Sequence, residues 1–212
     1  LEKQKIKEQK EKDEQEDTKW VYRVCCMIES DRLFGIPFFN THIDPTSYNK
    51  DELVNDIKTN YLKNPNRNEW DNLSNIHHSY NDWDNPDYIN LDFSKVQAVY
   101  NKIIPECLKK FKLKRGAKGN FRIVNYNCMS EGGYMAPHKH VNFDFVGIHY
   151  LQFDPKVHVP TEFINDFAQK SDVFVDDVYT SCYNSVWRMP VKEDMFCITP
   201  GFLSHQVPKQ PR

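Results

Sequence analysis

The sequence has 212 residues, of which 39% are hydrophobic and 14% aromatic, and its formal net charge is −2 at neutral pH. This length and composition predict one domain with a complete hydrophobic core. The nearly balanced charge gives no general attraction to nucleic acid or to an anionic membrane, and no run of about eighteen apolar residues predicts a membrane span. The six cysteines have no regular spacing and are typical of a reduced, cytoplasmic protein.

Residues 1–19 are almost entirely charged or amide-bearing, so they predict a solvated tail or helix, and residues 20–212 form the predicted single domain. Residues 20–30 have the composition of a strand. Residues 33–43 form a second apolar segment, in which Gly35 and Pro37 favour a strand at the edge of a sheet.

Two stretches carry apolar residues at helical spacing. The first is capped by Asn49 or Asp51 and stops at Asn64, before a proline. The second begins at Ser94 as its N-cap and extends to about residue 111, with a kink or break expected at Pro105. We expect both helices to cover a sheet.

The segment between the helices, residues 66–92, is rich in Asn, Asp and aromatic residues and predicts an ordered surface loop, or alternatively a lid over a substrate site. Its adjacent His77 and His78 would point in different directions on a strand, which argues against a shared metal. From Phe121 onward the chain reads as short strands joined by turns. Helices followed by many short strands predict an α+β domain with an antiparallel sandwich or barrel.

Three histidines form the candidate site. His138 and His140 are two residues apart in a segment of strand-forming composition, so both imidazoles should leave the same face of one strand. His205 lies in a short strand just after a Pro-Gly turn. Neutral imidazole is the commonest protein ligand of first-row metals, and three donors on one side of an ion leave positions open for chemistry. Ordinary hydrogen-bonded histidines are the alternative.

The segments HKHVNFDFVGIHYLQFD and KEDMFCITPGFLSHQVP resemble the iron(II)- and 2-oxoglutarate-dependent oxygenase superfamily, in particular its prolyl-hydroxylase-like branch in tailed phages and marine bacteria. The resemblance extends from about residue 33 to residue 212. It implies a double-stranded β-helix, a cupin-like jelly roll, with N-terminal helices packed on the major sheet. It also implies that His138 and His205 bind Fe(II), that Tyr150 bonds the distal carboxylate of 2-oxoglutarate, and that Tyr126 lies near this cosubstrate.

Two features depart from the family pattern. Most of the superfamily has a carboxylate where this chain has His140, although many phage-type relatives also show His-x-His. The family also places a basic residue about ten positions after the distal histidine, whereas Arg212 follows His205 by seven. We expect His140 as the third ligand, rank Asp144 below it as a substitute carboxylate, and take Arg212 as the candidate anchor or else an ordinary exposed basic residue.

The resemblance implies hydroxylation of an unactivated C–H bond in a peptide or small-molecule substrate, with prolyl or peptidyl hydroxylation as the first choice. A phage-encoded protein would act in the host cytoplasm or in the virion. Two alternatives stay open: a three-histidine cupin-type dioxygenase without 2-oxoglutarate, and an inactive module that assembles with viral structural proteins. Four aromatic residues are candidates for a substrate groove or for core packing, namely Tyr134, Phe143, Phe145 and Trp187.

Overall fold

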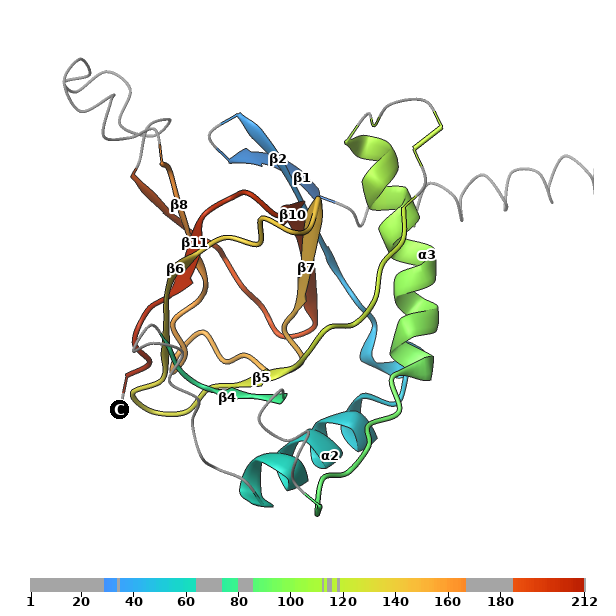
Figure 1. Ribbon diagram of the computed structural model, residues 1–212, viewed down its shortest axis with the longest axis vertical. Coiled ribbons are helices and arrows are strands. Elements are labelled where there is room, and N and C mark those ends of the chain that lie inside the picture. The colour runs from blue at the N-terminus through green and yellow to red at the C-terminus, as the bar shows by residue number, and fades with distance from the viewer. Residues whose placement is uncertain are drawn as a thin grey trace, which may run out of the picture.

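The computed structural model describes residues 29–33, 35–63, 74–79, 86–111, 113, 116–117, 119–166 and 185–211. The predicted tail at residues 1–19, the start of the first predicted strand and Arg212 lie outside this part of the chain. The described residues form helices and antiparallel sheets, so the predicted α+β class is confirmed (Figure 1). None of their helices is long and apolar enough to cross a membrane.

The described residues include two α-helices, α2 (Lys50–Lys63) and α3 (Ser94–Lys110), and a short 3-10 helix, η1, which spans Pro45–Ser47. The four-stranded sheet has the order β1-β2-β10-β7, with β1 at Glu29–Leu33, β2 at Ile36–His42, β7 at Phe145–His149 and β10 at Met195–Pro200. The five-stranded sheet has the order β3-β6-β11-β8-β9, with β3 at Ser74–Asn75, β6 at Tyr134–His138, β8 at Glu162–Ile164, β9 at Val186–Arg188 and β11 at His205–Val207. A separate pair joins β4 (His77–His78) to β5 (Asn127–Cys128). These described strands form open sheets and no closed barrel.

The four-stranded sheet is the middle one of three layers because its two central strands bury both faces. On β2, Phe39 faces the helices and joins the core formed with Val96 and Ile104 of α3. The neighbouring residue Phe38 faces the other way and packs edge-on against Phe163 of the five-stranded sheet, with ring centroids 5.5 Å apart. Successive side chains on a strand point to opposite faces, so one apolar run supplies a helix-side core and an inter-sheet core. Figure 1 shows the same order of layers.

The segment predicted as an edge strand is instead a hairpin. Gly35, with φ of 79°, makes the turn between β1 and β2, and β1 occupies the edge. Only the second half of β2, from Phe39 to His42, pairs with β10. Pro37 lies outside that pairing, so its missing N–H removes no hydrogen bond to β10 and the strand can be internal.

The helices follow the prediction except in two details. Ser94 is the first residue of α3 rather than its cap, and its N–H donates to the Asp92 carboxylate at 2.8 Å. Pro105 does not break α3, which runs to Lys110. Pro105 has no N–H to donate to the carbonyl of Asn101. Both residues are exposed, so this carbonyl faces solvent.

The predicted loop between the helices is partly ordered strand. Ser74–Asn75 joins the edge of the five-stranded sheet as β3, and the following pair of histidines forms β4. His77 and His78 are both buried, at 1% and 5% exposure, and neither belongs to the histidine cluster of the candidate site.

A buried polar contact joins α3 to the four-stranded sheet. The Tyr100 hydroxyl lies 2.8 Å from Nδ1 of His149, and the Nε2 atom of His149 has no hydrogen-bond partner among the described residues. Burial, followed by the charges of Lys50 and His42, lowers the pKa of His149 to about 4. His149 is therefore neutral in the folded protein over most of the acidic range.

This histidine predicts acid destabilisation. Because its pKa is about 4 when folded and near 6.5 when unfolded, the unfolded chain takes up the proton first as the pH falls. The free energy of unfolding should therefore decrease between pH 6.5 and 4, by up to ~1.4 kcal/mol per pH unit for this one proton. Urea denaturation with a metal chelator present, comparing the wild type with His149→Leu, should show a shallower pH slope in the variant. The exposed-site control His158→Leu should keep the wild-type slope, and identical slopes in all three proteins would contradict the assignment.

Candidate metal centre

Two of the candidate ligands face each other across paired strands. The β6–β11 pairing sets His138 directly opposite His205, and the β11–β8 pairing sets His205 opposite Phe163. Residues opposite each other in antiparallel strands point to the same face of a sheet. Phe163 belongs to the inter-sheet core, and its ring centroid lies 5.7 Å from that of His205. His138 and His205 are thus directed toward the space between the two sheets.

The third histidine is placed by a turn and not by the strand that the sequence predicted. β6 ends at His138, and His140 lies in the turn that leads to β7. Its N–H donates to the carbonyl of Gly201 at 2.8 Å, while the N–H of Gly201 donates to the carbonyl of Asp144 at 3.0 Å. Two turns distant in sequence, residues 140–144 and 200–203, are thereby joined, and His140 is held beside the strand pair.

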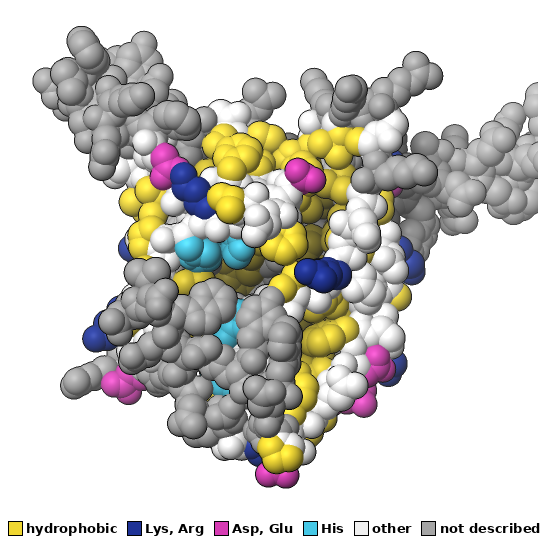
Figure 2. All heavy atoms as spheres, viewed as in Figure 1, with side chains coloured by type: hydrophobic (Ala, Val, Ile, Leu, Met, Phe, Trp, Pro, Cys, Tyr) yellow, Lys and Arg dark blue, Asp and Glu magenta, His cyan; other side chains and the backbone are white. Residues whose placement is uncertain are grey.

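The three imidazoles form one cluster. One ligand atom from each of His138, His140 and His205 lies within 4.8 Å of the others. The ring centroid of His138 is 4.3 Å from that of His205 and 5.1 Å from that of His140, and the remaining pair is 5.2 Å apart. Figure 2 shows histidine side chains reaching the surface on this face, beside hydrophobic ones. A metal ion could be bound by these residues.

Backbone carbonyls orient two of the rings. Nδ1 of His138 lies 2.9 Å from the carbonyl of Ala136, and Nδ1 of His205 lies 3.0 Å from the carbonyl of Leu203. A carbonyl can only accept, so each Nδ1 carries the proton and each Nε2 keeps its lone pair. Metal-binding histidines commonly donate their second ring nitrogen to a carbonyl in this way. The donor set therefore fits a divalent transition metal.

The surroundings of His140 and His205 favour their neutral rings. Burial, followed by the proximity of the other two histidines, lowers the pKa of His205 to about 4. Burial and the neighbouring His138 also lower the pKa of His140. A histidine must be deprotonated to bind a metal ion, so the low pKa values favour the ligand form at neutral pH.

A pair of hydroxyl groups lies in the same inter-sheet space. Tyr150 follows β7 and packs against the inter-sheet core, and its hydroxyl lies 2.6 Å from that of Thr161. Thr161 precedes β8 and is two residues from Phe163, the neighbour of His205. Burial raises the pKa of Tyr150 well above its ordinary value, so this hydroxyl stays protonated. The sequence indicated Tyr150 but not Thr161. Only the alternation of side chains along β8 and the residues just before it could have suggested Thr161.

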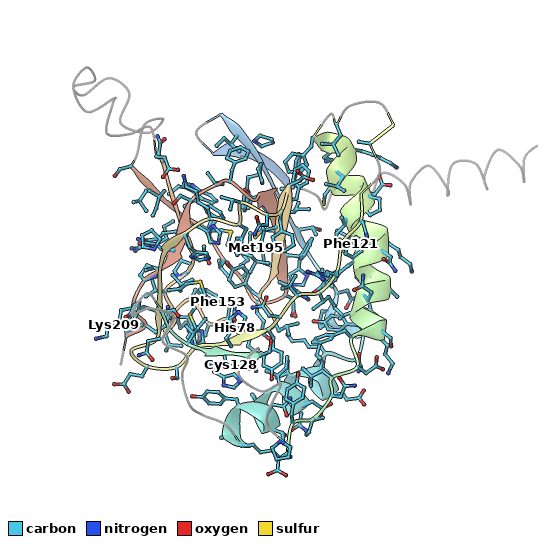
Figure 3. The ribbon with its side chains drawn as sticks, in the orientation of Figure 1. His78, Phe121, Cys128, Phe153, Met195 and Lys209 are labelled. Atoms are coloured by element: carbon cyan, nitrogen blue, oxygen red, sulfur yellow. The ribbon has the colours of Figure 1, made fainter. Side chains whose placement is uncertain are left out.

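The remaining candidates lie elsewhere. Tyr126 is buried in the helix-side core, where its ring stacks on His77 at 6.1 Å. Asp144 is exposed and is not part of the histidine cluster, which among the described residues has no carboxylate. Arg212 is outside the described residues, and the exposed side chain of Lys209 lies at the outer edge of the molecule, away from Phe153 of the inter-sheet core (Figure 3).

A comparison with protein-family models finds none that matches the chain, and no curated protein matches it either. The three-histidine cluster therefore rests on the geometry of this chain alone.

Removing a ligand should abolish metal binding. His138→Ala or His205→Ala leaves two imidazoles, and we expect at least a tenfold loss of affinity for Co(II) or anaerobic Fe(II) in calorimetry, because a three-donor set becomes incomplete. His42→Ala removes an exposed histidine of β2 and should bind the metal as the wild type does. Undiminished metal content in either ligand variant would rule out the centre.

Metal binding should be equally sensitive to a change at the junction of the two turns. A Cβ atom added to Gly201 would overlap the carbonyl oxygen of Phe143 and lie 2.6 Å from that of His140. Both obstacles are backbone, so Gly201→Ala should force the turns apart and displace His140, weakening metal binding about tenfold or more. Gly147→Ala crowds the Phe196 ring instead and serves as the control for general destabilisation. Equal metal affinities in both variants would show that the junction does not position His140.

Proposed function

We propose that this chain is an iron(II)- and 2-oxoglutarate-dependent oxygenase with a double-stranded β-helix fold, which hydroxylates an unactivated C–H bond, with a prolyl or other peptidyl substrate as the first choice. The observation that carries the proposal is the cluster of three imidazoles, with two Nε2 atoms left free by backbone carbonyls. The two facing antiparallel sheets are compatible with this fold. When bound, iron(II) and 2-oxoglutarate would together activate molecular oxygen, the oxidant, of which one atom enters the hydroxylated substrate and the other enters succinate, with carbon dioxide as co-product.

The chain itself contributes binding and placement. His138, His140 and His205 would hold the ion on one side and leave its other side open to ligands. Tyr150 would donate to the distal carboxylate of the cosubstrate while its oxygen accepts from Thr161, since either hydroxyl of the pair can be the donor between them. The inter-sheet core beside them excludes water from this end of the site.

The cosubstrate carboxylate also requires electrostatic compensation in an apolar interior. Three basic side chains near the sheets are already engaged: Lys139 pairs with Asp166, Arg188 with Glu162, and Lys50 with Glu193 and Asp194. The family resemblance makes Arg212 the candidate for the compensating cation, and the alternative is that Arg212 is an ordinary exposed basic residue.

A second candidate function follows from the third imidazole. A dioxygenase that uses a three-histidine metal centre without 2-oxoglutarate requires no carboxylate ligand and no cosubstrate anchor. The absence of a carboxylate from the described cluster favours this candidate.

Cosubstrate binding and turnover distinguish the two candidates. The protein loaded anaerobically with Fe(II) should bind 2-oxoglutarate in calorimetry and, on admission of oxygen, form succinate in step with oxygen uptake; His205→Ala should do neither. Metal binding without 2-oxoglutarate binding or succinate would reject the oxygenase in favour of the second candidate. A wild-type protein that binds no metal would reject both.

The hydroxyl of Tyr150 gives a finer test. Tyr150→Phe removes one hydrogen bond to the cosubstrate, so the binding free energy of 2-oxoglutarate should weaken by ~0.5–1.5 kcal/mol. The dissociation constant should then rise about 2- to 13-fold. Tyr48→Phe is the matched control, because the Tyr48 hydroxyl is buried in the helix-side core and has no hydrogen-bond partner in the part of the chain that the structure describes. Equal affinities in the two variants would remove Tyr150 from the cosubstrate site.

A further inference from the structure

The two joined turns that hold the histidines also expose large apolar side chains. Val141 and Phe143, in the turn after His140, are 78% and 41% exposed, and Phe202, in the turn before His205, is 58% exposed. Scattered exposed apolar residues need no explanation, but these three lie on turns whose backbones are hydrogen-bonded to each other. Together they give the rim of the histidine cluster an apolar character.

A pocket of about 310 Å³ opens beside this rim. Its apolar walls come from Val141, Ile164, Phe202 and Leu203, with Ile36 of β2 on the remaining side. Its charged residues are Lys139 and Asp166, which form an ion pair with each other. These two charges are paired with each other, and apart from Asn165 the remaining lining residues are apolar, so the pocket favours an apolar group over an ionic one.

The pocket adjoins the ligands through the chain itself. Lys139 separates His138 from His140, and Val141 follows His140 directly. The carbonyl of Leu203 accepts the hydrogen bond that orients His205. The N–H of Ile164 donates to the carbonyl of Ser204 at 2.9 Å, which joins the pocket wall to the residue preceding His205. None of the three histidines lines the pocket, so a group held there would lie beside the two turns that carry the cluster.

The volume limits the size of that group. An apolar cavity of about 150 Å³ accommodates a benzene ring, so this pocket has room for one aromatic ring or branched aliphatic side chain with part of its main chain. We infer that the pocket receives an uncharged apolar side chain of the metal centre's own substrate and so decides which C–H bond faces the ion. This inference rests on the proposed metal centre.

Two hydroxamates form a probe pair for the test. Acetohydroxamate and phenylacetohydroxamate chelate a metal ion through the same head group, and only the second carries an aromatic ring. With the protein loaded with Co(II), the phenyl compound should bind at least about tenfold more tightly, since burial of a ring side chain is worth more than one factor of ten. The cobalt absorption spectrum reports each binding curve.

Neutral polar substitutions at the rim should remove this preference. Val141→Asn and Phe202→Asn each change an exposed side chain, so the fold and the affinity for acetohydroxamate should stay unchanged while the advantage of the phenyl compound falls severalfold. Val157→Asn is the matched control, at a valine that is 54% exposed and does not line the pocket, and it should keep the full preference.

The outcomes separate the two levels of inference. If the wild type binds no cobalt, the metal centre and this inference both fail. If acetohydroxamate binds to the cobalt-loaded protein and the phenyl ring adds nothing, or if the rim variants keep the full preference, the metal centre stands and the pocket assignment is overturned.

Discussion

The candidate centre depends on the pairing of β6 with β11, which sets His138 opposite His205. These residues are 67 positions apart in sequence, and only the ladder between the two strands brings them together. A shift of one residue in that register would turn one of the two imidazoles to the other face of the sheet. The irregular pairing between His205 and Val207 lies just beyond this point, so the register is kept at the histidines and changes after them. The junction between the two turns then adds His140 to a geometry that the strands have already set.

The same register explains why the site can be both buried and chemically open. His205 is 4% exposed and faces Phe163, whose ring is fully buried, so one side of the cluster is part of the inter-sheet core. His138 and His140 are only partly buried and lie at the turn, toward the exposed rim. Burial lowers the pKa values of His140 and His205, and backbone carbonyls orient the rings of His138 and His205, while the other side stays accessible to ligands.

The elements that are marked by their own residues or by the residues next to them were predicted well. The end of α2 before Asn64 follows from the proline that comes next, and the α+β class follows from the order of helical and strand-like segments. The residue pattern suggested His205 as a partner of His138 but could not give the pairing of their strands, because nothing in a strand's own sequence specifies which distant strand it pairs with. The hairpin at Gly35 was missed for a related reason: an apolar run containing glycine is consistent with one interrupted strand or with two paired strands.

The features of the site that escaped prediction all depend on contacts between distant segments. Thr161 becomes notable only because β8 pairs with β11, which directs it toward the Tyr150 hydroxyl. Gly201 matters because two backbone carbonyls approach it, one of them from the residue that follows His140 by three positions. Neither residue type carries a signal of its own, since threonine and glycine are common in strands and turns for unrelated reasons.

The third imidazole finally has an electrostatic consequence for the proposed chemistry. Three neutral ligands leave a divalent ion with its full double charge, whereas a carboxylate in place of His140 would reduce it by one. A dianionic cosubstrate would then bring the net charge of the three-histidine centre to zero without any cationic side chain. In an apolar space, a neutral sum avoids most of the desolvation penalty of an unpaired charge, and the hydroxyls of Tyr150 and Thr161 can satisfy the distal carboxylate by hydrogen bonding. The replacement of a carboxylate by His140 and a reduced need for a basic anchor are therefore consistent with each other.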